Sequence, residues 1–425
     1  MNKKLTPISF AKKIFPLNRS LSGSGNRQTL KEIKKLCSKL IIKKFVSNKK
    51  VYDWRIPLEW NVRDAYIIDP NGKKICSFKK NNLHLVGYSY PQKKNINLNE
   101  LQKHLHSIPD KPSAIPYVTT YYEKNWGFCI SHKQRKKLIR GNYKVFINTE
   151  LKKGALNYGE IFIKGKSNKE VFFSTYICHP SMANNETSGI TVNTFLAKIL
   201  SKKKTYYSYR FVFLPETIGS IAYLSKNLKK MKAKIIAGFN ITCVGDERSF
   251  SLLLSKYGNT FTDFIAKKNF KILKGKKRIY SWNDRGSDER QYCSPFIDLP
   301  ICSLMRSKYG EYKEYHNSLD QLGSVVTNKG LSQSIEVYKK IIEDIEKSNF
   351  PTSVKKCEPF MTKYNLYNTL KKNKFKINPR KIMDYLSWCD GKNSSEMIKE
   401  KINVSKLFEK DIFKVLLKKK LIKLF

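Results

Sequence analysis

The sequence predicts an α/β protein with a mostly parallel sheet and helices on both of its faces. Three apolar runs of strand length, residues 170–178, 209–216 and 234–245, lack the alternation of a strand with one wet face, so each is expected to be buried on both faces. The segments between them, residues 189–203 and 220–231, have the length and pattern of helices. Strands that alternate with helices indicate βαβ units around a parallel sheet.

One helix is expected ahead of this sheet, over residues 27–45. Its apolar side chains recur every three or four residues, which is the spacing of a single helix face. They are Leu30, Ile33, Leu36, Cys37, Leu40, Ile41 and Phe45.

Two further domains are expected because 425 residues exceed the usual size of a single core. From about Arg55 to Tyr158 the chain consists of short alternating runs broken by Asn-Gly and proline turns, which predicts a β-rich insertion. The last thirty or so residues have the pattern helix, turn, helix, strand of a winged helix. The predicted division is an α/β domain over 1–54 and 159–350, an inserted β-rich domain over 55–158 and a winged-helix domain over 354–425.

The chain is strongly basic, with 83 Lys and Arg against 34 Asp and Glu and a formal charge of +49. Lysine is spread over nearly every segment, which indicates a compositional bias rather than one nucleic-acid groove. No cluster of base-reading Arg or Asn stands out in the winged helix, so packing on the rest of the chain or on a partner protein is favoured there. Nucleic acid binding through the winged helix, and a polyanionic substrate, stay open as alternatives.

The cytoplasm is the expected location. Nine cysteines without a CxxC pair indicate reduced thiols. Lys12 and Lys13 interrupt the apolar residues near the N-terminus before they form a signal-peptide core, and no stretch approaches the roughly 18 apolar residues of a membrane span.

Potential metal ligands and proton acceptors follow the predicted strands. His179, Glu216 and Asp246 each close a strand, and His316 lies in a later polar loop, so all four can meet at one rim of the sheet. Histidine and carboxylate are ligands of catalytic zinc, and a glutamate beside the bound water can act as general base. The alternatives are a hydrogen-bonded loop histidine, a glutamate near a helix N-terminus and a turn aspartate. Asp320, four residues after His316, could orient a metal-bound imidazole or make only a local hydrogen bond.

Four ordered motifs, HPSMANNETSG, PETIGS, RGSDERQY and YHNSLD, resemble those of the zinc aminopeptidase and glutaminyl cyclase superfamily. The opening PLNRSLSGSGNRQTL extends the similarity to a bacterial aminopeptidase-like branch with an inserted β-rich domain and a C-terminal winged helix. The resemblance implies that His179 and His316 are metal ligands, that Glu216 is the catalytic glutamate and that Asp246 matches a metal aspartate.

Two positions depart from the two-metal pattern. Asn185 stands where those enzymes have a bridging aspartate, and Thr217 stands where they have a glutamate ligand, so one zinc ion is expected. Glu186 could replace the missing carboxylate or bind a substrate amine. Asn185 is then a candidate for substrate binding.

The motif RGSDERQY adds further candidates. The resemblance implies that Asp288 and Arg290 line the substrate pocket, and Asp288 is a second candidate for a catalytic role. Arg285 and Arg306 are additional candidates for binding an anionic group, the alternative for these residues being surface salt bridges.

The implied activity is zinc-assisted hydrolysis of an amide in a peptide or an amino-conjugated small molecule. A non-hydrolytic binding or regulatory protein that retains the fold is the alternative, and Asn185 and Thr217 favour it. Glutaminyl cyclase-like acyl transfer is a third reading. The resemblance also implies a link to surface polysaccharide biosynthesis.

Overall fold

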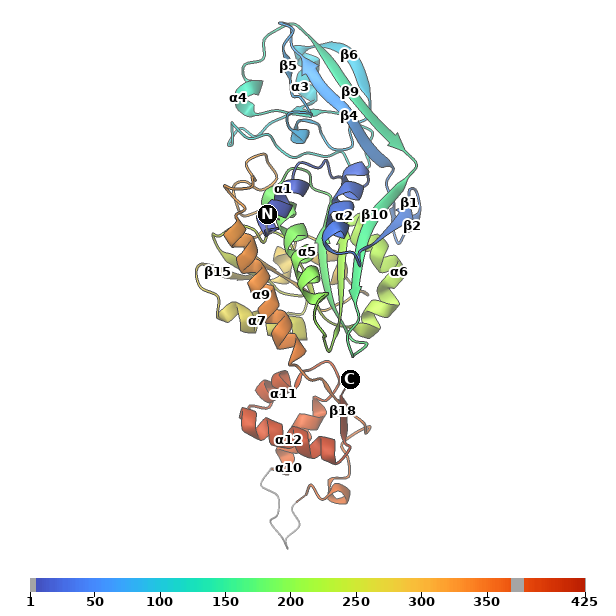
Figure 1. The fold of residues 1–425 in the computed structure, drawn as a ribbon, viewed down its shortest axis with the longest axis vertical. Coiled ribbons are helices and arrows are strands. Elements are labelled where there is room, and N and C mark those ends of the chain that lie inside the picture. The colour runs from blue at the N-terminus through green and yellow to red at the C-terminus, as the bar shows by residue number, and fades with distance from the viewer. Residues whose placement is uncertain (1–4, 368–377, 425) are drawn as a thin grey trace.

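The protein consists of three bodies stacked along one axis (Figure 1). The computed structural model describes residues 5–367 and 378–424. A domain built on an eight-stranded sheet lies in the middle, with a second body around a four-stranded sheet at one end and the C-terminal body at the other. This architecture confirms the predicted α/β fold class with its C-terminal winged helix.

The central sheet has a parallel core and antiparallel margins. Its strand order is β1-β10-β12-β11-β13-β16-β14-β15. The parallel strands are β12 (Ser208–Leu214), β11 (Glu170–Tyr176), β13 (Ile235–Asn240) and β16 (Ile301–Met305). The flanking strands are β1 (Ile41–Val46), β10 (Ala155–Ile163), β14 (Phe250–Leu253) and β15 (Lys277–Tyr280). Every side chain of β11 and β12 is buried, as the absence of alternation predicted.

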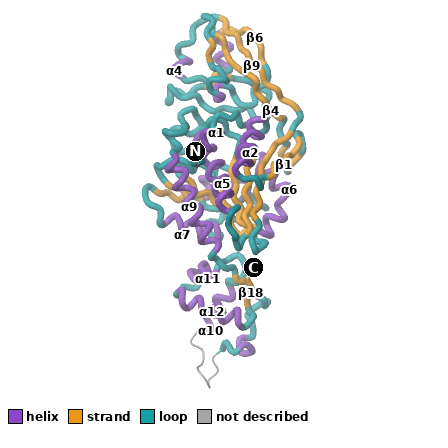
Figure 2. The backbone as a smooth tube through the Cα atoms, viewed as in Figure 1, coloured by secondary structure: helices purple, strands orange, loops and turns teal. Residues whose placement is uncertain are grey.

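Helices cover both faces of this sheet (Figures 1 and 2). On one face Phe173 of β11 contacts Tyr338, and on the other Phe172 contacts Tyr223 and Tyr292. The first face carries α1 (Pro7–Ile14), α2 (Ser24–Leu36), α5 (Ser188–Leu200), α7 (Phe261–Lys271) and α9 (Asn328–Glu346). The second carries α6 (Ile218–Lys234) and α8 (Glu289–Tyr292).

The prediction of one helix over residues 27–45 is wrong for the second half of that range. Helix α2 ends at Leu36, and residues 41–46 form the edge strand β1, paired antiparallel with β10. The helical spacing continues by coincidence into a segment rich in β-branched residues. Pairing with β10 gives that segment a hydrogen-bonded partner that sequence spacing cannot reveal.

The second body is joined to the central sheet through a pair of long antiparallel strands. Strand β9 (Asn142–Lys152) pairs with β4 (Glu59–Ile68) and leads into β10 after a two-residue turn. Its sheet has the order β5-β4-β9-β6, with β5 (Lys74–Ile75) and β6 (Gln92–Asn97). The smaller elements are β2 (Lys50–Val51), β3 (Trp54–Arg55), η1 (Asn82–His84), α3 (Leu98–Lys103), β7 (Leu105–His106), β8 (Phe128–Cys129) and α4 (His132–Arg135).

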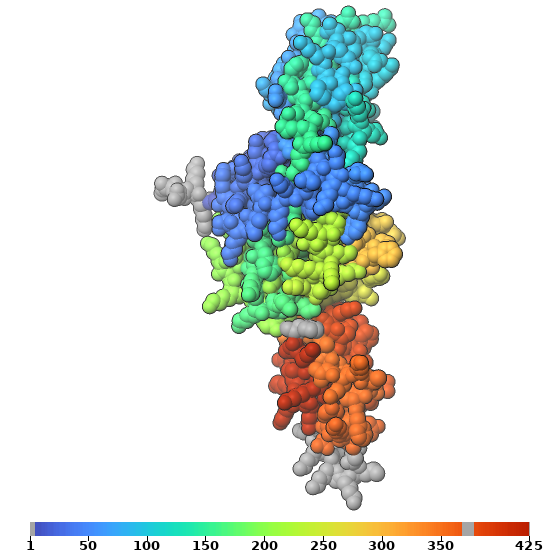
Figure 3. All heavy atoms as spheres, turned by 90° about the vertical axis from the view of Figure 1, so that its right-hand side faces the viewer, coloured from blue at the N-terminus to red at the C-terminus, as the bar shows by residue number. Residues whose placement is uncertain are grey.

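The C-terminal body forms a separate lobe (Figure 3) with its own apolar core. It contains β17 (Pro351–Ser353), η4 (Met361–Tyr364), α10 (Pro379–Ser387), α11 (Ser395–Lys401), α12 (Lys406–Lys418) and β18 (Ile422–Leu424). Met397 of α11 joins the hydrophobic cluster of the sheet domain, and Glu396 pairs with Lys268 at 2.8 Å. The first helix of the helix-turn-helix therefore rests on the sheet domain. None of the helices within 5–367 and 378–424 is long and apolar enough to cross a membrane.

Candidate functional site

Several candidate residues lie where parallel strands end. His179 follows β11 and Glu216 follows β12, and these two strands are neighbours in the sheet. The segment after β13 carries Asp246, and the long loop after β16 carries His316. Carboxyl ends of parallel strands share one edge of a sheet, so these four segments start from the same side of the molecule.

The centre of the cluster is the contact between His179 and Glu216. Nε2 of the imidazole lies 3.9 Å from Oε2 of the carboxylate, and the two side chains are 3% and 18% exposed. Cys178 completes a group whose ligand atoms lie within 4.8 Å of one another. Its Sγ accepts the backbone N–H of Glu216 at 3.2 Å and lies 3.4 Å from Nδ1 of His179. The thiol thereby links the imidazole of His179 to the backbone of Glu216.

His316 reaches the same centre from the loop after β16. Its ring centroid lies 5.2 Å from that of His179, and its buried Nε2 has no hydrogen-bond partner among the described residues. The backbone of His316 has φ of +54°, which is rare for a residue with a side chain, and its ring stacks on Tyr315 at 3.8 Å. Strained backbone of this kind collects at functional sites.

The inserted domain supplies one wall of the site. The ring of Tyr117 lies 5.2 Å from His179 and 5.4 Å from His316. Its backbone N–H donates to the carbonyl of His316 at 2.9 Å. Ile115 and Ser318 exchange two hydrogen bonds beside it, at 2.8 and 2.9 Å. The segment from the insertion therefore pairs, like a short strand, with the loop that carries His316.

Burial makes both imidazoles neutral. Desolvation lowers the pKa of His316 to about 4, and desolvation with the nearby charge of His316 and Arg19 lowers the pKa of His179 well below its usual value. Burial raises the pKa of Glu216, and the charge of Asp288 raises it further, while a hydrogen bond from Ser287 and the Arg290 charge act in the opposite direction. Neutral imidazoles offer the lone pairs that a metal requires.

The side-chain oxygen of Asn185 accepts no hydrogen bond from the described residues. Its side chain is buried, Oδ1 has no hydrogen-bond partner there, and Nδ2 points to Cys243 Sγ at 3.8 Å. Asp320 fixes the backbone by accepting the N–H groups of Asn184 at 2.8 Å and Asn185 at 3.1 Å. Asp320 thus orients Asn185, and its carboxylate is committed to these N–H groups.

Thr217 and Asp288 form a second polar group beside Glu216. Asp288 accepts the N–H of Thr217 at 2.7 Å and the hydroxyl of Ser220 at 2.8 Å. Arg290 donates from Nη2 to Oγ1 of Thr217 at 3.0 Å and from Nε to the Ser287 carbonyl at 3.1 Å. A guanidinium therefore lies next to Thr217. Burial raises the pKa of Asp288, opposed by the hydrogen bonds from Thr217 and Ser220.

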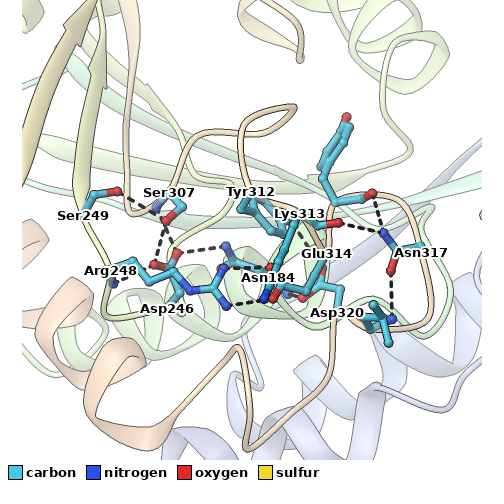
Figure 4. Close-up of polar contacts among 12 residues, drawn as sticks. Asn184, Asp246, Arg248, Ser249, Ser307, Tyr312, Lys313, Glu314, Asn317 and Asp320 are labelled. Carbon is cyan, nitrogen blue, oxygen red and sulfur yellow. Dashed lines mark hydrogen bonds and ion pairs between the residues drawn. The ribbon is translucent and has the colours of Figure 1, made fainter. Parts of the chain in front are cut away.

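Asp246 is not part of the group formed by Cys178, His179 and Glu216, and Figure 4 shows the contacts that its carboxylate makes. Its carboxylate accepts the N–H and hydroxyl of Ser307 at 2.9 and 2.8 Å, the amide of Asn184 at 3.0 Å and the N–H of Arg248 at 2.9 Å. Four donors use the lone pairs that a carboxylate offers. Arg248 in turn donates to Glu314, with bonds of 2.7 and 3.0 Å, so this network anchors the loop that carries His316.

The remaining candidates make other contacts, although Glu186 lies close enough to Glu216 for the two carboxylates to repel each other. Glu186 is buried, accepts the Thr175 hydroxyl and lies against Gly189, and burial raises its pKa well above the usual range. The guanidinium of Arg285 is exposed and bonds to the Trp282 carbonyl at 3.2 Å. Arg306 lies over the ring of Phe250 in a separate cleft.

Sequence reasoning missed three residues that shape the site. Cys178 has a signal in the sequence, since it directly precedes His179. Arg19 donates from Nε to the carbonyl of His179 at 2.9 Å and from Nη2 to Thr187 at 3.0 Å, but its position 160 residues earlier gives no local signal. Tyr117 lies in the inserted domain, where the alternating pattern indicates only strands and turns.

Two family models match this chain, one to most of it and one to its C-terminal part. Residues 8–348 match the model of a domain of unknown function, DUF4910, and residues 349–424 match a winged helix-turn-helix model. A protein of Clostridium acetobutylicum is 41% identical over 383 residues, which are 90% of this chain and 87% of its relative. It is provisionally named as a polysaccharide biosynthesis protein with an aminopeptidase-like domain.

Solved structures show the same fold. A crystal structure from Clostridium acetobutylicum, provisionally described as a peptidase, has a TM-score of 0.81 at 38% identity and covers 99% of this chain and 96% of its own. A zinc aminopeptidase from Bacillus subtilis has a TM-score of 0.57 at 13% identity, covering 81% of this chain and 96% of its own. At that identity the similarity is one of fold.

Proposed function

Because this chain belongs to the DUF4910 family and has a zinc aminopeptidase-like fold, we propose that it hydrolyses an amide bond with one zinc ion and with Glu216 as general base. The observation that supports this most directly is the contact of Glu216 with His179, 3.9 Å apart at the carboxyl edge of the sheet. His316 reaches the same centre with a free Nε2 among the described residues.

The residues present offer donor atoms of the kind that one zinc ion binds. His179 and His316 would bind it through neutral imidazole nitrogens, and Asn185 would add its carbonyl oxygen. Nε2 of His316 and Oδ1 of Asn185 are buried acceptor atoms without hydrogen-bond partners among the described residues, and a bound ion would give both of them a partner. Two imidazoles with one oxygen leave the open position that a catalytic zinc needs.

A second ion does not fit the position of Thr217. The guanidinium of Arg290 already donates to Thr217 Oγ1 at 3.0 Å, so a metal cation there would face a like charge at short range. A hydroxyl is also a weak ligand compared with a carboxylate. The guanidinium of Arg290 thus supplies part of the positive charge that a second metal ion would bring to this position.

The bound zinc would polarise the scissile carbonyl and lower the pKa of water. Glu216 accepts the proton of that water and delivers it to the leaving amine. Burial raises the pKa of Glu216 to about 8, Ser287 and Arg290 oppose this rise, and the charge of a bound zinc would further favour the ionised, proton-accepting form. Tyr117 covers the two imidazoles and keeps bulk water from them. The substrate class is a peptide or an amino-conjugated small molecule.

Metal content tests this proposal directly. Elemental analysis of the wild type is expected to give about one zinc per chain, and His179→Ala and His316→Ala are each expected to lose it because each removes one of only two nitrogen ligands. His132→Ala, in the inserted domain, serves as the control and keeps the ion. A wild type without metal after zinc is supplied would overturn the hydrolase and favour a binding protein that retains the fold, as Asn185 and Thr217 suggest.

Asn185→Asp is expected to raise zinc affinity at least tenfold. A carboxylate is a stronger ligand than an amide, and Oδ1 of Asn185 lies buried without a partner in the described chain. Competition with a chelator of known affinity measures the change. Asn193→Asp, on α5, is the matched control and should leave the affinity unchanged. An equal change in both variants would show that Asn185 is not a ligand.

A further inference from the structure

We propose that a cleft between α7 and α9 binds a small carboxylic acid with an apolar chain through Arg306. Arg306 follows β16 and is only 4% exposed. Its Nε and Nη1 are buried and have no hydrogen-bond partner among the described residues. The guanidinium carbon lies 3.9 Å from the centre of the Phe250 ring. This site is separate from the His179 and Glu216 centre and does not rest on the proposed function.

The unpaired N–H groups of Arg306 indicate that a ligand binds there. Burial of a guanidinium is costly unless its N–H groups are paired, and contact with an aromatic face replaces only part of the lost hydration. Asp246 and Glu247 lie near enough to raise the pKa of Arg306, but burial outweighs them and the pKa is lowered. Neither carboxylate makes a hydrogen bond to it. An apolar side chain of similar length would fill the same space without this penalty.

The charges around the cleft favour an anion. Glu247 pairs with Lys329 at 2.8 Å, and Glu336 pairs with Lys339 at 2.7 Å, so both acids that line the cleft are already neutralised. Arg306, which also lines the cleft, has no ion pair within the described ranges. An entering anion therefore meets uncompensated positive charge.

The walls of the cleft determine the class of ligand. It is an open cleft of about 540 Å³, and its apolar lining residues are Phe250, Ile272, Leu273 and Val337. The planar fork of a guanidinium matches the two oxygens of a carboxylate. Apolar walls around one charged group are typical of sites for small organic ligands, which favours a carboxylate with an apolar chain over inorganic phosphate.

Isothermal titration with hexanoate, hexanamide and inorganic phosphate tests the proposal on the full-length protein. Hexanoate is expected to bind, and hexanamide, which has the same shape without the charge, at least tenfold more weakly. In Arg306→Met hexanoate affinity should fall at least tenfold. Arg278→Met, which removes an exposed guanidinium beside Glu311, should leave it unchanged.

Three results would overturn the proposal: equal affinity for hexanoate and hexanamide, hexanoate affinity that survives in Arg306→Met, or binding of phosphate in preference to hexanoate. Thermal unfolding shows whether Arg306→Met is folded. Its melting temperature is expected to equal or exceed that of the wild type, because the substitution removes a buried cation without hydrogen bonds.

Discussion

Replacement of Glu216 by Gln is expected to lower kcat by about 10³-fold while the zinc content stays at the wild-type value. The amide keeps the size of the carboxylate and can still accept a hydrogen bond from Ser287, but it cannot accept the proton of the attacking water. Zinc remains because His179 and His316 are unchanged. Release of the amine from an aminoacyl anilide gives the rate, and elemental analysis gives the metal.

Glu343→Gln is the matched control, since it makes the same change at an exposed position of α9 and should retain the full rate. If Glu216→Gln kept more than about a tenth of the wild-type kcat, Glu216 would not be the general base. Loss of zinc together with activity would instead make Glu216 a metal ligand.

Arg210→Met is expected to destabilise the fold by about 3–5 kcal/mol, the cost of a buried ion pair that loses one partner. Arg210 lies on β12 and is 5% exposed. It donates to Glu170 at 2.6 and 3.0 Å and lies 3.1 Å from Glu160. The substitution leaves two buried carboxylates with less compensating charge. Chemical denaturation monitored by tryptophan fluorescence measures the change in unfolding free energy.

A second substitution separates the charge effect from lost packing. Glu170→Gln in the Arg210→Met background should recover part of the loss, because it removes one uncompensated carboxylate. Lys339→Met, which breaks an exposed pair with Glu336, should remain within about 1 kcal/mol of the wild type. Equal losses in Arg210→Met and Lys339→Met would contradict the argument.

The parallel core of the fold could be predicted from the sequence because its strands are apolar on both faces. Runs such as residues 170–178 leave few alternatives to a strand covered on both sides. Residues 41–46 were mistaken for helix because an edge strand has one exposed side and its spacing there happens to suit a helix. Only the long-range partner β10 decides between the two structures.

The sequence could predict those site residues whose location depends only on the order of the strands in the sheet. His179 and Glu216 follow neighbouring strands, and their contact follows from that order. Asp246 also follows a strand, but the direction of its side chain depends on donors from Ser307 and Asn184, distant in sequence. For the same reason no local pattern could identify Tyr117, whose place beside both imidazoles depends on how the insertion docks.

The pairing of residues 115–118 with the His316 loop limits how this protein can be divided or rebuilt. Residues 59–152 leave and re-enter the sheet domain through the paired strands β4 and β9, and the central sheet would keep all its strands without them. His316, however, would lose the backbone donor and the aromatic wall that hold it in its left-handed conformation. The insertion is therefore not an interchangeable module, and a minimal version of this protein has to include it.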